Sequence, residues 1–128
     1  MRTVHAVLSI LLVAHMAHVA LGAQAPPAKA DVVMVAGCLR EPAAGEWRVV
    51  NATDPKPSNA NAPAAADLPA LPVVGKNQFQ LIGVSIFDLP SHKDHTVVLK
   101  GLLIPAKPVS RLNITSIVTV APTCTAAK

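Results

Sequence analysis

Five segments of the chain carry apolar residues in the patterns that β-strands show. The segments are residues 31–40, 46–53, 77–84, 96–104 and 111–121. In the last of them, one face collects the apolar residues Leu112, Ile114, Val118 and Val120. The opposite face is polar, and this alternation is typical of a half-buried antiparallel strand.

The second and third segments alternate in the same way. Trp47 and Val49 alternate with charged residues, and Phe79 and Leu81 alternate with glutamines. No segment has the period of a strong amphipathic helix, and the connector 85–95 is expected to form at most one helical turn. Five short strands of this kind predict an all-β fold, either a small barrel or a compact sandwich.

A proline- and alanine-rich stretch, residues 54–76, separates the second predicted strand from the third. Residues 54–72 hold 5 of the 12 prolines. Repeated prolines remove backbone donors, which excludes a regular strand and argues against a long helix. Each flank is too short to bury a core alone, so we expect a loop inserted within one domain, residues 31–124. Residues 125–128 are expected to form a tail.

The first residues have the layout of a secretory signal. Arg2 precedes the mostly apolar residues 4–21, and Gly22 and Ala23 supply small side chains. We therefore expect a signal peptide over 1–23, followed by a flexible leader over 24–30. Histidines interrupt the apolar run, which makes a transmembrane helix the weaker alternative. The expected location is periplasmic or secreted, with no stable membrane anchor after cleavage.

Charge and aromatic content argue against nucleic acid as a partner. The chain has 11 Lys and Arg against 7 Asp and Glu, and the basic residues are scattered along it. Its aromatic residues are Trp47, Phe79 and Phe87. A binder of single-stranded nucleic acid needs exposed aromatic platforms beside a positive groove, and a small aliphatic core already needs at least two of these rings.

The expected export determines how the two cysteines are interpreted. In an oxidising compartment, an isolated pair in a small domain is most simply a disulfide, which predicts a bond between Cys38 and Cys124. Two separate reactive thiols are the alternative. A redox pair of the Cys-x-x-Cys type lacks the required spacing.

Several short motifs follow one another in a recognisable order. They are "GCL" (37–39), "FQLIG" (79–83), "HKDH" (92–95), "VVLKG" (97–101), "LNITS" (112–116) and a closing Cys124. This order resembles a group of small exported bacterial proteins that look like five-stranded, antiparallel barrels of the oligonucleotide/oligosaccharide-binding (OB) type. The resemblance implies an OB-like barrel stapled by Cys38 and Cys124, and it brings no activity with it. The insertion departs from the compact pattern.

His92 and His95 form the one constellation that suggests chemistry. Their spacing of three would bring both rings to one side of a helical turn, so a metal site at His92 and His95 is one hypothesis. A zinc site needs three or four protein ligands, and the alternative is a polar loop that leads into the next strand. No serine lies in a Gly-x-Ser-x-Gly sequence, so we expect no catalytic residue, no enzyme and no cofactor.

These observations favour an exported, non-enzymatic β-barrel module that binds a small ligand or an unknown envelope protein. The insertion is the expected variable element at its binding side. A structural or stress-related envelope protein is the first alternative, and a metal-binding protein that uses His92 and His95 is the second.

Overall fold

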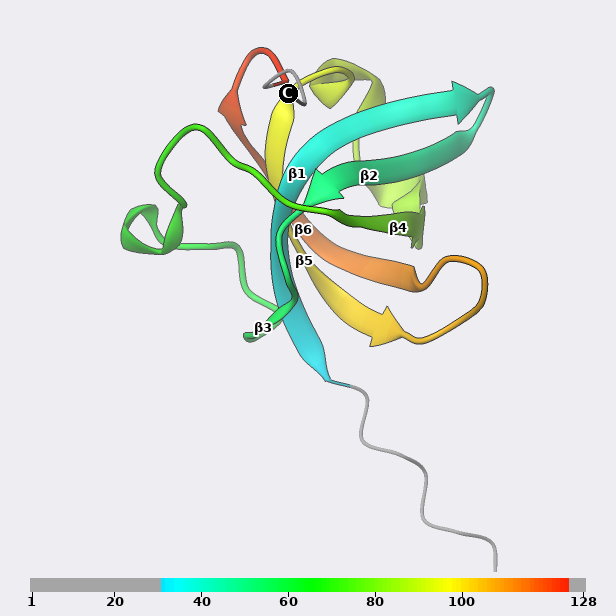
Figure 1. The fold of residues 1–128 in the computed structure, drawn as a ribbon, viewed down its shortest axis with the longest axis horizontal. Helices are drawn as coiled ribbons and strands as arrows, with labels where there is room; N and C mark the ends of the chain where they lie inside the picture. The colour runs from blue at the N-terminus through cyan, green and yellow to red at the C-terminus, as the bar shows by residue number, and fades with distance from the viewer. Residues whose placement is uncertain (1–30, 125–128) are drawn as a thin grey trace, which may run out of the picture.

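The computed structural model describes residues 31–124, and strands are the main regular elements within them (Figure 1). The strands are β1 (Val32–Ala43), β2 (Glu46–Ala52), β3 (Lys56–Pro57), β4 (Asn77–Ile82), β5 (Thr96–Ile104) and β6 (Arg111–Ala121). Three short 3₁₀ helices join them: η1 (Ala65–Asp67), η2 (Val84–Ile86) and η3 (Leu89–His92). The all-β expectation is confirmed. The predicted signal peptide (1–23), leader (24–30) and tail (125–128) lie outside the described residues.

The five longer strands pair into a closed ring. β1 pairs with β2, β2 with β4, β4 with β6, β6 with β5, and β5 returns to β1. The sixth strand, β3, adds to a free part of β1 beside the ring. Its proline is compatible with this position because Pro57 lies on an edge, where a missing N–H is tolerated.

The expectation of a purely antiparallel arrangement is wrong for one pair. β4 and β6 run parallel, with Leu81 opposite Leu112, whereas the other pairings are antiparallel. The reason is arithmetic: strands that alternate in direction cannot close a ring with an odd number of members. A five-stranded ring must contain at least one parallel pair.

β1 belongs to two parts of the ring, and Gly37 lies where it passes from one to the other. Its first residues pair with β3 and β5, and its last residues pair with β2. A Cβ atom at Gly37 would lie 2.8 Å from Cγ2 of Val49 and 2.9 Å from the Cα of Ala52. The absence of a side chain at Gly37 therefore allows β2 to approach β1 closely.

β1 also continues further than the sequence pattern predicts. The predicted strand ended at residue 40, but β1 runs to Ala43 and the turn is confined to Ala44 and Gly45. The register shifts between Arg40 and Ala43. Pro42 lies in this irregular stretch, where the ladder does not require its missing N–H.

The ring encloses one aliphatic core, to which two of the three aromatic rings contribute. The fully or nearly buried members include Val35, Leu39, Trp47, Val49, Phe79, Leu81, Leu89, Val97, Leu99 and Leu112. Phe87 is half-buried and packs against this cluster. The prediction that the core needs at least two of the aromatic rings is confirmed.

A bulge in β6 changes which residues face that core. Lys100 pairs with Ser116, but the next residue of β5, Gly101, pairs with Ile114, so Thr115 is an extra residue. Beyond it Ile117, rather than the expected Val118, packs against the core. The sequence alternation alone assigned Val118 and Val120 to the wrong face, because a bulge shifts every later position by one.

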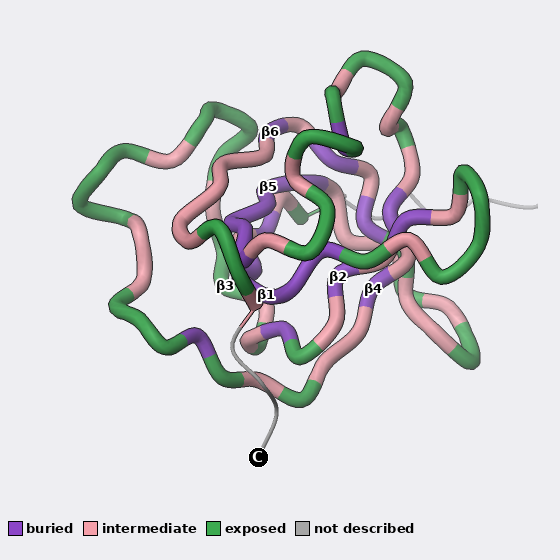
Figure 2. Tube along the Cα trace, turned by 90° about the horizontal axis from the view of Figure 1, so that it is seen from above, coloured by how far each residue is buried: buried purple, intermediate pink, exposed green. Residues whose placement is uncertain are grey.

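The insertion folds back against the outside of the ring. It lies mostly exposed beside the buried strands (Figure 2), yet Val73 is buried and Leu68 is half-buried. Both belong to a second small apolar cluster with Ala36 and Val98, which project from the outer face of β1 and β5. Thr53 fixes the start of the insertion, because its N–H donates to the Ala36 carbonyl and its hydroxyl accepts from the Ala36 N–H.

None of the helices in residues 31–124 has the length and apolar character needed to cross a membrane.

Gly37→Ala should destabilise the ring. The added methyl group meets side-chain and backbone atoms of β2 at less than 3.0 Å, and overpacking of this kind costs about 1–3 kcal/mol. Urea unfolding of the protein measures the loss of stability. Ala43→Val, at an exposed position of the same strand, is the control and should change stability by less than about 0.5 kcal/mol. Equal stabilities for Gly37→Ala and the wild type would contradict the close approach.

Candidate binding site

The segment "HKDH" holds one end of the ring together. η3 ends at His92, the first residue of this segment, and buries Leu89, which is 1% exposed, in the main core. The chain then pairs with β1: the Leu39 N–H donates to the His95 carbonyl over 3.0 Å, and the Asp94 N–H donates to the Leu39 carbonyl over 2.9 Å. Asp94 has a φ of 64°, a left-handed conformation that aspartate tolerates better than most residues.

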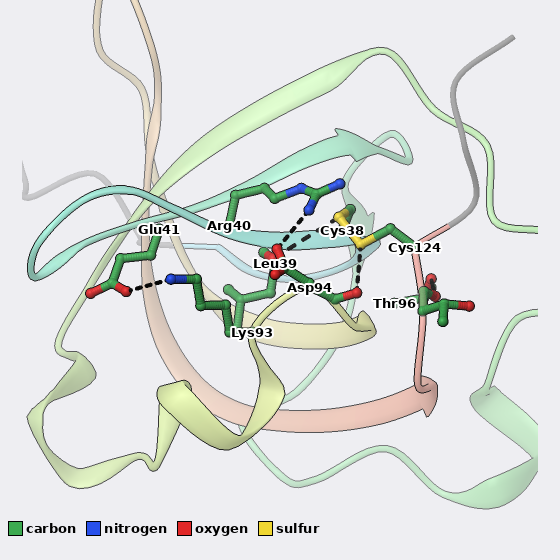
Figure 3. A network of polar contacts seen from close by, with 9 residues as sticks. Cys38, Leu39, Arg40, Glu41, Lys93, Asp94, Thr96 and Cys124 are labelled. Atoms are coloured by element: carbon green, nitrogen blue, oxygen red, sulfur yellow. Dashed lines mark hydrogen bonds and ion pairs between the residues drawn. A yellow bond between two sulfur atoms is a disulfide. The ribbon is translucent and has the colours of Figure 1, made fainter.

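Charged side chains reinforce this contact with β1 (Figure 3). Arg40 Nη1 donates to Asp94 Oδ1 over 2.6 Å, and Lys93 Nζ donates to Glu41 Oε2 over 3.1 Å. The pKa of Glu41 is held below its ordinary value, first by the hydrogen bond from the Gly45 N–H and then by Lys93. Both pairs are largely exposed, so their contribution to stability is small.

His92 and His95 turn toward the same hydroxyl group. The Nδ1 atoms of His92 and His95 lie 2.7 Å and 3.4 Å from Thr119 Oγ1. Asp94, the nearest acidic residue in the sequence, is turned to Arg40 instead. Among residues 31–124, no group of three or more His, Cys, Asp or Glu residues could hold a metal ion. The structure therefore gives the histidine pair a hydrogen-bonding partner, and the metal hypothesis stays a prediction.

The predicted disulfide is present at this end of the ring. Cys38 and Cys124 are bonded, their Cα atoms lie 5.4 Å apart, and the bond spans a sequence separation of 86 residues. Sγ of Cys124 lies 3.1 Å from the Asp94 carbonyl oxygen. The Thr96 hydroxyl donates to the Thr123 carbonyl over 2.8 Å. The disulfide thus fixes the last described residues beside β1 and the start of β5.

A pocket lies on the outer face of the sheet, between the insertion and strands β1 and β5. Its volume is about 230 Å³, and its lining residues are Met34, Val35, Ala36, Thr53, Lys56, Asp67, Leu68, Pro69 and Val98. The strands supply an apolar floor and the insertion supplies Leu68 and Pro69 as a wall. The carboxylate of Asp67 is engaged locally, because its Oδ2 accepts from the Ala64 N–H over 3.1 Å.

A second hollow of about 470 Å³ adjoins the pocket. It is lined by Thr53, Asp54, Lys56, Val74, Gly75 and Lys76, so it shares Thr53 and Lys56 with the first. Gly75 touches the backbone of Ala52 so closely that a Cβ atom would overlap it. This contact holds the end of the insertion against β2 and keeps the hollow beside the pocket.

Two buried polar residues, Lys100 and Ser116, lie near the pocket and were not singled out from the sequence. Lys100 is 3% exposed and Ser116 is 8% exposed. A signal was available for Lys100, which is the only charged residue within the apolar run "TVVLKGLLI". Lys100 shares a face of the strand with Val98, two residues before it, but the sequence does not show that this face is covered.

Comparison of the chain with protein-family models, with curated proteins and with solved structures found no match.

Removing the disulfide should lower stability substantially. The bond closes a loop of 86 residues, and the chain-entropy model gives about 4 kcal/mol for a loop of this order. The double variant Cys38→Ser/Cys124→Ser should lose this amount in urea unfolding. Wild-type protein unfolded with a reductant provides the matched comparison and should behave like the double variant. A difference in unfolding free energy below about 1 kcal/mol between the wild type and the double variant would contradict a stabilising role for the disulfide.

Thr119→Val should also destabilise the protein, by about 1 kcal/mol, because it removes the hydroxyl group that both histidine rings face. Thr115→Val is a matched control on the same strand, since the Thr115 hydroxyl is buried without a partner among the described residues. The Thr115→Val substitution should be neutral or stabilising.

Thermal melting with and without zinc tests the metal hypothesis. If zinc raises the melting temperature of the wild type and His92→Ala abolishes this rise, the histidine rings bind the metal.

Proposed function

We propose that the protein is an exported, non-enzymatic binding module with an OB-like barrel, and that it takes a small ligand into the pocket beneath the insertion. The observation that carries the proposal is the outer apolar cluster. Leu68 and Val73 pack on Ala36 and Val98, and the insertion still leaves a pocket of about 230 Å³ beside them. Concave sites with an apolar floor and a few polar groups are the usual form of small-molecule sites.

The order of strands supports the OB-like part of the proposal. In chain order, the five long strands pair first with second, second with third, third with fifth, fifth with fourth, and fourth with first. A five-stranded Greek-key ring of this kind is the architecture of OB folds, whose faces and loops bind ligands. The fold does not choose the ligand, which must be inferred from the site.

The disulfide supports export, because such bonds persist in oxidising compartments such as the periplasm and the extracellular space. The aromatic residues argue against nucleic acid as the ligand. Trp47 and Phe79 are 6% and 5% exposed, and Phe87 packs against the core. Stacking with bases requires exposed rings.

An envelope protein is the second candidate partner, and exposed apolar side chains in the insertion favour it. Leu71 is 54% exposed and Val74 is 75% exposed, and Val74 lines the second hollow. Side chains of this kind, rimmed by polar residues, are typical of interaction surfaces. A partner bound here would cover the same side of the molecule as a ligand in the pocket.

A ligand screen with a variant whose pocket is filled tests the proposal. Ala36→Leu adds side-chain atoms to the pocket floor, and Ala43→Leu makes the same change at an exposed position of the same strand. Ligand-observed NMR on the exported chain should find compounds that bind the wild type and Ala43→Leu but bind Ala36→Leu at least about tenfold more weakly. Melting curves establish that both variants fold.

Two results would contradict the proposed site. If every compound that binds the wild type also binds Ala36→Leu equally well, the pocket is not the binding site. If no compound binds, and both the wild type and Ala36→Leu retain the same protein from envelope extract, the binding partner is that protein and not a small ligand in the pocket.

A further inference from the structure

Four residues from four strands form a row across the outer face of the sheet. Lys56 of β3 pairs with Met34 of β1, Met34 pairs with Lys100 of β5, and Lys100 pairs with Ser116 of β6. Directly paired residues of antiparallel strands project from the same face with their Cβ atoms about 5 Å apart. The row therefore places Lys100 and Ser116 on the same face as Lys56 and Met34, which line the pocket.

Lys100 is buried without enough acceptors among the described residues. Its ammonium group has three donors, and its one described hydrogen bond is to Asn59 Oδ1 at 3.4 Å. That oxygen already accepts from the Asn61 N–H over 3.1 Å. None of the ion pairs found within residues 31–124 involves Lys100. A charge that is 3% exposed and so sparsely compensated is costly in an otherwise apolar strand.

Ser116 also lacks a hydrogen-bond partner among the described residues. Its hydroxyl is buried, and the residue is directly opposite Lys100. An anion placed between them would accept from the ammonium group and from the hydroxyl at once. One oxyanion bound here would therefore satisfy the remaining ammonium donors of Lys100 and the hydroxyl of Ser116.

The pocket floor adjoins this position. Met34 pairs with Lys100 across the strands, and Val98 lies two residues before it on the same face. Both line the pocket. A molecule whose charged end is at Lys100 can therefore extend an apolar part over Met34, Ala36 and Val98.

The remaining charges at the pocket leave the balance positive. Lys56 lines it and Asp67 opposes it, but Asp67 already accepts a hydrogen bond from the Ala64 N–H. Together with Lys100, the pocket and its edge have two cationic side chains, Lys56 and Lys100, and one anionic side chain, Asp67. From the row and its two unsatisfied groups, we infer that the ligand is a small carboxylate with a short apolar chain, bound through Lys100 and Ser116. This inference rests on the proposed function and names its ligand class.

Hexanoate and its neutral analogue hexanamide are matched probes for the inference. Amide resonances of the full exported chain, titrated with each probe, report binding at Met34, Ala36 and Val98. Hexanoate should bind the wild type at least about tenfold more tightly than hexanamide, because only the carboxylate makes a charge-assisted hydrogen bond with Lys100. An equal concentration of sodium chloride controls for ionic strength.

Three variants complete the test. Lys100→Met approximately keeps the length of the side chain and removes its charge. The affinity of this variant for hexanoate should therefore fall to its affinity for hexanamide. The same variant should melt at a higher temperature without a ligand, because it removes a poorly compensated buried charge. Ser116→Ala should weaken hexanoate about two- to tenfold. Lys107→Met, at an exposed position in the turn after β5, should leave the affinities for both probes unchanged.

The outcomes separate the two proposals. Equal affinities for hexanoate and hexanamide, with shifts at Met34, Ala36 and Val98, would overturn the carboxylate inference and leave the pocket as the binding site. Shifts confined to exposed lysines such as Lys107 would show an adventitious ion only and also overturn it. If neither probe shifts the pocket amides, the inference is overturned, and the Ala36→Leu screen decides the proposed function separately.

Discussion

The structure depends on the double pairing of β1. This strand closes the ring by joining β2 to β5, and its first residues also hold β3 and the start of the insertion. The glycine at position 37 makes both possible, because a side chain there would collide with β2. The same strand therefore supplies the inner surface that the core needs, through Val35 and Leu39, and the outer surface on which the insertion rests, through Ala36.

One end of the ring and its outer face are stabilised by different means. At one end, the disulfide and the segment "HKDH" fix the chain to β1 with hydrogen bonds, ion pairs and a covalent bond. On the outer face, the insertion is held by apolar contacts of Leu68 and Val73 and by Thr53. A surface held by few apolar contacts opens more easily than one held by a disulfide, which suits the binding role proposed for it.

The sequence predicted the strands well because their patterns are local. The bounds of β5 and β6 agree with the predicted segments, and Trp47, Val49, Phe79 and Leu81 face the core as their alternation required. The extra residue Thr115 was missed because a bulge is visible only in the pairing of two strands. The parallel pair of β4 and β6 followed from the odd number of strands, and the antiparallel expectation overlooked it. The spacing of the histidines suggested metal ligands, whereas no local pattern indicates the burial of Lys100, because that burial involves a distant, proline-rich segment.

The proposed site requires the insertion to pack on the outer face of the ring as a wall, and not to extend as a free linker. Methyl–methyl nuclear Overhauser effects in the protein test this packing most directly. We expect cross-peaks from Leu68 and Val73 to Ala36 and Val98, since these residues belong to one apolar cluster. Random-coil methyl shifts for Leu68 and Val73, without cross-peaks to β1 or β5, would contradict it.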